Sequence, residues 1–140
     1  MRLLKDGKRV IASNLCGIHV PINGMYLAFG PAEEAAAPDA DYSYFSRLAQ
    51  TQGRGYVRVP VVSTQLEDSG KIIFSGAITS KDLEGLKLTK DSILTTATLV
   101  HMNEQDKTKD LFVYSTVLKN QIKIIPGTYI AVNVGISIGD

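Results

Sequence analysis

The sequence of 140 residues has few of the residues that most often carry chemistry. It holds one cysteine, Cys16, two histidines, His19 and His101, and no tryptophan. A single cysteine forms no intrachain disulfide, and we expect Cys16 to be buried as a small hydrophobic side chain. Cys16 and His19 form a lone C-x-x-H pair, whereas zinc needs two further ligands at a suitable spacing. We therefore expect no metal and no other cofactor.

An excess of charge is also missing, because 15 basic and 14 acidic residues give a net charge of +1. Such a chain has no bulk attraction to nucleic acid or to anionic lipid, so we expect neither as a partner. The start, MRLLKDGKRVIAS, has no apolar stretch long enough for a signal peptide or a membrane span. We expect a protein that is made and used without secretion through the membrane machinery and that folds as one domain over residues 1–140.

Catalytic motifs are missing as well. The sequence has neither a G-x-x-x-x-G-K-[ST] loop nor a G-x-S-x-G elbow, and Ser75 falls within an expected strand. A cluster of carboxylates, Glu33, Glu34, Asp39 and Asp41, lies in an alanine-rich connection without periodicity. General acid–base pairs need a rigid and partly desolvated setting, so we interpret this connection as a solvated linker. We predict that the protein is not an enzyme and has no catalytic residues.

The strongest pattern that is present is a period of two near the C-terminus. In YIAVNVGISI, branched aliphatic residues alternate with small, polar or aromatic ones, and they are Ile130, Val132, Val134, Ile136 and Ile138. This period places the aliphatic residues on one buried face of a strand. A slip of one residue would expose all of them, at about 1.5–3 kcal/mol each, so the strand fixes its own register.

Further β runs at short spacing predict a mainly β fold. They are Met25–Phe29, Tyr56–Val62 and residues 71–78, 93–100 and 111–118. The acidic turn Glu67–Gly70 predicts a hairpin between the second and third runs, and the polar residues 101–110 predict another between the last two. Pro60 indicates an edge strand or a bulge. We expect an antiparallel β-sandwich, Ig-like or jelly-roll-like, with one or two short helices.

Two segments have helical character. Lys8–Cys16, stopped by Gly17, predicts a short helix within an N-terminal helix or arm at about residues 1–17. DYSYFSRLAQ predicts one or two helical turns anchored by aromatic side chains, which we interpret as a lid over one end of the sandwich. The connection Pro31–Asp41 before it cannot be a core strand, so we expect it to cross from one sheet to the other.

A basic and aromatic stretch, TQGRGYVRV, suggests a contact with phosphate or with a stacked base. The alternative, which we favour, is a flexible segment leading into an edge strand, with Arg58 pointing outward. The candidate interface combines this stretch with the aromatic segment, and its residues are Tyr42, Tyr44, Phe45, Arg54, Tyr56 and Arg58.

Three segments then follow one another in a recognisable order: NGMYLAFG at residues 23–30, Tyr44–Ala49, and YVRVPV at residues 56–61. This order resembles small virion structural proteins of tailed bacteriophages, in which segments similar to NGLYLEY and YLRVPL occur. The resemblance implies a non-enzymatic β-sandwich that is incorporated into the particle. Its matching positions are strand residues, so it transfers no binding residues to this chain.

The leading hypothesis is therefore a capsid decoration (cement) protein on the outer capsid surface. The resemblance implies a location in the virion, many copies or a homo-oligomer, and the major capsid protein or tail and fibre proteins as partners. An alternative is a tail, collar or fibre attachment component. An alternative of another class is a stand-alone glycan- or peptide-binding module, with Tyr42, Tyr44 and Tyr56 as its aromatic candidates.

Overall fold

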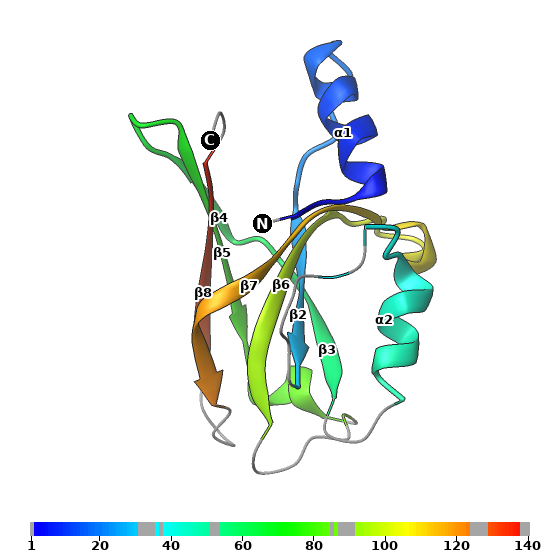
Figure 1. Cartoon of the computed structure of the whole chain (residues 1–140), viewed down its shortest axis with the longest axis vertical. Coiled ribbons are helices and arrows are strands. Elements are labelled where there is room, and N and C mark those ends of the chain that lie inside the picture. Colours follow the sequence, from blue (N-terminus) through cyan, green and yellow to red (C-terminus); the bar gives the residue numbers. More distant parts are fainter. Residues whose placement is uncertain are drawn as a thin grey trace.

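The protein is a β-sandwich in the computed structural model, which describes residues 2–30, 36, 38–50, 54–84, 86, 92–123 and 129–137. Two antiparallel sheets face each other, one of five strands in the order β1-β7-β6-β2-β3 and one of three in the order β4-β5-β8 (Figure 1). The predicted mainly β, antiparallel sandwich with short helices is confirmed.

Along the chain the strands change sheets between β3 and β4, between β5 and β6, and between β7 and β8. The five-stranded sheet contains β1 (Arg2–Leu3), β2 (Gly24–Phe29), β3 (Gly55–Pro60), β6 (Ile93–His101) and β7 (Leu111–Lys123). The three-stranded sheet contains β4 (Ser63–Leu66), β5 (Lys71–Ile78) and β8 (Ile130–Ser137). The described helices are α1 (Lys5–Leu15), α2 (Tyr42–Leu48) and two short 3-10 turns, η1 (Ser80–Leu83) and η2 (Lys107–Lys109).

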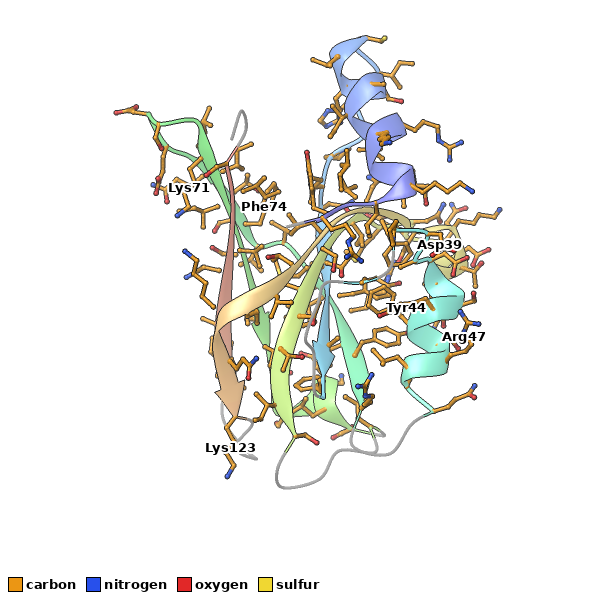
Figure 2. All side chains as sticks on the ribbon, viewed as in Figure 1. Asp39, Tyr44, Arg47, Lys71, Phe74 and Lys123 are labelled. Carbon is orange, nitrogen blue, oxygen red and sulfur yellow. The ribbon has the colours of Figure 1, made fainter. Side chains whose placement is uncertain are left out.

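Strand β8 has the alternation that its sequence predicts. Val132, Val134 and Ile136 are at most 4% exposed, whereas Asn133 and Ser137 face solvent. The buried residues pack in the core between the sheets, and Figure 2 shows Phe74 of β5 on that side. The predicted register of the strand is confirmed over Ile130–Ser137, and Ile138 lies outside the described residues.

The hairpin around Glu67–Gly70 joins β4 to β5, so its first arm is not the predicted run Tyr56–Val62. That run forms β3 in the other sheet and ends at Pro60, at the sheet edge that this proline predicts. The chain changes sheets at Val61 and Val62, where the Val62 N–H already donates to the Ser75 carbonyl at 2.8 Å. The segments before and after this crossing both form strands, so the sequence pattern does not indicate where the chain changes sheets.

The connection between β2 and β3 does not cross between the sheets, contrary to prediction. These strands are neighbours in one sheet, with Phe29 opposite Gly55. Described parts of the connection lie over the outer face of that sheet (Figure 1). Ala36 and Ala40 are buried there, so the interpretation as a solvated linker is wrong at both positions. Their small side chains allow close packing on the sheet, and an alanine without a periodic context gives no signal of burial.

Helix α1 begins at Lys5, earlier than predicted, and its first half lies on β7. Gly7 makes this possible, because a Cβ there would collide with the Val113 carbonyl oxygen. The second half of the helix extends past the end of the five-stranded sheet (Figure 1). Cys16, at the end of the helix, is therefore exposed, and the prediction that it is buried is wrong.

Candidate interface

Five of the six candidate residues meet on the outer face of the five-stranded sheet. Tyr42, Tyr44 and Phe45 come from α2, and Tyr56 and Arg58 come from β3. The helix therefore covers a face of the sandwich, and the predicted lid over one end is wrong. Figure 2 shows Tyr44 on the side of α2 that faces the sheet and Arg47 on the far side.

The sixth candidate, Arg54, lies apart from this group. It precedes β3, and its side chain lies against Gly30 at the end of β2. Because the Gly30 backbone has a φ of 116°, a side chain at that position would be strained as well as crowded by Arg54.

Helix α2 is set at its start by Asp41. The Asp41 carboxylate accepts hydrogen bonds from the Tyr44 N–H at 3.1 Å and from the Ser43 hydroxyl at 2.8 Å. The Ser43 bond and then the Tyr44 bond hold the pKa of Asp41 below its ordinary value. An ionised carboxylate at this position stabilises the first turn of the helix. This cap turns Tyr44 and Phe45 toward the sheet.

An aromatic cluster fills the space between α2 and the sheet. Its centre is Tyr26, which stacks on Tyr56 at 5.0 Å between ring centres and meets Phe45 and Phe112 edge-on at 4.9 Å each. Phe45 is 1% exposed, so it is a core residue of this cluster and not a surface contact. Such ring pairs contribute about 0.5–1.5 kcal/mol each beyond the area that they bury.

A buried ionic network lies beside the aromatic cluster. The Asp110 carboxylate accepts hydrogen bonds from the Tyr26 hydroxyl at 2.6 Å and from the Arg58 Nε and Nη2 at 2.7 and 3.0 Å. The Asn103 N–H donates to the same carboxylate at 2.7 Å. Arg58 also donates to the Asn103 carbonyl at 3.0 Å, so it points into the fold and the prediction that it points outward is wrong.

The charges of this network are held fixed. Burial acts to raise the pKa of Asp110, but the hydrogen bonds from Arg58, Tyr26 and Asn103 outweigh it and hold the pKa below its ordinary value. The bond to Asp110 raises the pKa of Arg58. Burial, and then the bond to Asp110, raises the pKa of Tyr26, so its hydroxyl remains a donor. The network therefore acts as a bridge between β2, β3 and the start of β7.

The rim of the cluster is formed by Tyr56 and Tyr42. Burial, and then a hydrogen bond with Tyr42, raises the pKa of Tyr56. The Lys107 ammonium lies 5.7 Å from the centre of the Tyr42 ring. One face of Tyr56 is stacked on Tyr26 and is therefore covered. The aromatic side chains that the sequence suggested for ligand binding thus pack in large part against other rings of the protein.

The residues considered for metal binding are Cys16, His19 and His101. Cys16 and His19 are exposed near the end of α1. His101 lies at the end of β6. Its Nδ1 is 2.7 Å from the carbonyl oxygen of Pro21, in the segment before β2. In the part of the chain that the structure describes, no three His, Cys, Asp or Glu residues are placed to hold a metal ion.

Most of the large exposed apolar side chains lie on two projections at one end of the molecule. The large ones among the described residues are Leu15, Ile18, Val62, Leu66 and Tyr129, each more than 60% exposed. The first two lie on a projection that we call the finger, which is α1 with the segment to residue 20. The next two lie on the hairpin, residues 62–72. Both projections extend from the same end of the sandwich (Figure 1).

The finger is held in shape by Asn14. Its side-chain amide donates to the carbonyls of Val10 at 3.0 Å and Val20 at 2.9 Å, and its Oδ1 accepts from the Val20 N–H at 2.9 Å. Gly17, with a φ of 85°, allows the sharp turn between helix and return segment. The exposed Leu15 and Ile18 are thus presented on a preorganised support.

Sequence reasoning missed both the ionic network around Asp110 and the exposed apolar end. Asp110 has no local signal, because its partners Tyr26 and Arg58 lie 84 and 52 residues away. Leu66 directly precedes an acidic turn, and Ile18 directly follows the glycine that ends α1. Apolar residues next to such turns are a usable signal for an exposed tip, since a turn between elements usually lies at the surface.

Comparisons with protein-family models, with curated proteins and with solved structures find no significant match. Among the helices that the structure describes, none has the length and apolar character needed to cross a bilayer.

Proposed function

We propose that this chain is a structural protein of a tailed-bacteriophage virion and that it decorates the outer surface of the capsid. Its resemblance to such proteins rests on NGMYLAFG and YVRVPV, which occupy β2 and β3. These strands pair directly, with Tyr26 opposite Arg58 and Leu27 opposite Val57. The segments that carry the resemblance therefore belong to one continuous structural unit, which supports the proposal.

The observation that carries the proposal is the apolar end of the molecule. Four of the five large exposed apolar side chains in the described ranges lie on the finger and the hairpin. Grouped exposed apolar side chains mark surfaces that become buried in an assembly. A decoration protein needs such a surface, and it needs a rigid body that does not deform when the surface is covered.

The body of the protein fits this role. The aromatic cluster fastens α2 to the five-stranded sheet, and the Arg58–Asp110 pair joins β3 to the start of β7. A net charge of +1 keeps repulsion small when many copies crowd onto one shell. The chain thus combines a fixed framework with one end suited to contact.

Quantitative mass spectrometry of purified particles tests the proposal. A copy number that matches the lattice of the major capsid protein supports decoration. About six to eighteen copies would indicate the alternative, a tail, collar or fibre attachment component, because those structures have low cyclic symmetry. Absence from particles would contradict both roles.

A binding assay tests the apolar end directly. Shells prepared without the protein are incubated with the purified chain or with the double variant Ile18→Ser, Leu66→Ser. We expect the double variant to lose most of its binding, because both side chains are exposed and removing them leaves the core intact. Lys123→Ser, at the opposite end in Figure 2, is the matched control and should bind like the original chain.

A further inference from the structure

We infer that the finger and the hairpin form a self-complementary surface through which two copies of this chain associate head to head about a two-fold axis. The inference deepens the proposed function, on which it rests for the need to bury this end, by naming a second copy on the shell as the partner. Paired copies then bind the shell together, so loss of the pairing weakens the binding of each copy. The observations behind it are the charges, the order of residues and the rigidity of the two projections.

The finger is basic. Lys5, Lys8 and Arg9 lie along α1 and are exposed, with Asp6 as the carboxylate among them, 3.5 Å from the Arg9 guanidinium. Between Gly7 and residue 22 the sequence has no acidic residue. The finger therefore carries a net positive charge near its base and apolar side chains at its tip.

The hairpin is acidic. Glu67 and Asp68 form its turn, and residues 61–70 contain no lysine or arginine. Lys71 follows the turn, and its aliphatic stem lies over Gly135 of β8. The hairpin therefore carries negative charge at its tip, with the exposed Leu66 directly beside the turn and the exposed Val62 at its base.

The two projections have the same features in opposite order. On α1, Lys8 and Leu15 are separated by about 10 Å at the helical rise per residue. On the hairpin, Leu66 lies directly beside the acidic turn, and Val62 lies no more than about 20 Å from Asp68 even at the full rise of a strand. When two copies meet head to head, the finger of one runs antiparallel to the hairpin of the other. The apolar tip of each finger then meets the apolar base of the other copy's hairpin, and the basic base of the finger meets the acidic tip of that hairpin.

Two-fold symmetry uses this contact twice, because each copy offers one finger and one hairpin. Neither projection needs to become ordered on binding. Asn14 fastens the return segment to the finger, and β4 is hydrogen-bonded to β5, which also pairs with β8. Preorganised surfaces lose little conformational entropy on association.

Sedimentation velocity of the purified chain over a range of protein concentrations is the first test. We expect a concentration-dependent shift from the monomer mass to twice that mass. The dimer should weaken as salt rises, because opposite charges steer and stabilise the contact. A chain that stays monomeric at every concentration overturns the inference.

Charge reversal gives the second test. One chain carries Lys8→Glu and Arg9→Glu, and the other carries Glu67→Lys and Asp68→Lys. Each alone should dimerise at least about tenfold more weakly, since like charges then face each other. Mixed together, the two chains should restore the dimer, because opposite charges then meet in both contacts. The acidic finger of the first chain meets the basic hairpin of the second, and the basic finger of the second meets the acidic hairpin of the first. Unchanged self-association of either chain, or no recovery on mixing, contradicts the inference. Circular dichroism confirms that both chains are folded.

The native thiol on the finger gives a third test. A chain with Cys16 is mixed with a Cys16→Ser chain that carries Thr64→Cys, near the base of the hairpin. The antiparallel arrangement brings these positions together, so mild oxidation should yield a mixed disulfide. Ser69→Cys, in the hairpin turn, is the matched control, because the same arrangement places it at the base of the partner's finger. Equal cross-linking of both variants, or none with Thr64→Cys, contradicts this geometry.

The outcomes separate the inference from the proposed function. A chain that is monomeric in solution but present in purified particles contradicts the two-fold contact and leaves the virion role standing. A chain that dimerises as described but is absent from particles contradicts the virion role and supports the two-fold contact.

Discussion

The outer faces of the two sheets are built in different ways. The five-stranded sheet is covered by α2 and by the aromatic cluster around Tyr26, with Asp110 buried at its edge. The three-stranded sheet presents short or polar side chains outward, among them Ser75, Asn133 and Ser137, and no described helix lies over it (Figure 1).

This difference is written into the burial of the strands. All six residues of β2 are buried, because both of its faces are covered. In β8 only every second residue is buried, because one of its faces meets solvent. A strand between two layers has no alternation, whereas a strand at the surface must alternate. The comparison also locates stability: side chains on the covered face should matter far more than those on the open face.

The largest expected effect is that of Phe45→Ala. The substitution leaves a cavity against Tyr26 and Phe112, so we expect a loss of about 3–5 kcal/mol in the free energy of unfolding, measured by urea denaturation. Ile73→Ala on the open face is the matched control and should cost about 1 kcal/mol, because Ile73 is only half-buried. Equal losses in the two variants would contradict the claim that the covered face contributes more to stability than the open face.

Asp110→Asn should have the next largest effect. It leaves the Arg58 guanidinium without its anionic partner, so we expect a loss of about 3 kcal/mol, at the low end for a buried pair because the Arg58 side chain is 27% exposed. Adding Arg58→Met should cost less than the sum of the separate substitutions. Additive losses, measured in a double-mutant cycle, would show that the pair does not act as a unit.

A pH titration of stability should isolate the carboxylate of Asp110. Its pKa in the folded protein is lowered, chiefly because the bonds from Arg58 and Tyr26 outweigh the effect of burial. Its contribution is therefore complete above the unfolded pKa of about 3.9 and is lost as pH falls from there through the folded value. The original chain should lose stability below about pH 4 more steeply than Asp110→Asn. Parallel curves would contradict the assignment.

The smallest effect should come from Ser75→Ala on the open face. The Ser75 hydroxyl donates to the Asn133 Oδ1 at 2.6 Å, but both groups are accessible to water. Because water can replace this bond, we expect a change within about 0.5 kcal/mol. A shift of the unfolding midpoint comparable to that of Asp110→Asn would show that the open face contributes to stability in a way its exposure does not suggest.

Features that depend on neighbours in sequence could be predicted. The register of β8 follows from branched aliphatics at every second position, and the edge position of β3 follows from the missing N–H of Pro60. The aromatic anchoring of α2 likewise follows from Tyr44 and Phe45 beside Asp41. In each case one or two residues decide the local structure, and the surrounding fold only has to accommodate it.

Features that depend on distant partners could not be predicted. Nothing near Arg58 in the sequence distinguishes it from an exposed basic residue, and its partners Asp110 and Asn103, 52 and 45 residues away, draw it inward. Ala36 and Ala40 are buried because a sheet lies beneath them, which their own segment does not encode. Cys16 is exposed because α1 outruns the sheets, and helical periodicity says nothing about where the supporting surface ends.

The pairing of Phe29 with Gly55 has a consequence for local opening. The chain between them leaves the sheet and returns to it at directly opposed residues, so releasing α2 breaks no strand pairing. The amides of α2 should then exchange with solvent through a sub-global opening whose free energy is below that of unfolding the sheets. The tethers at both ends keep the released helix close to its site, so it docks again without a search. Helix α2 is therefore a cover that can detach and bind again while the pairing of β2 with β3 is kept.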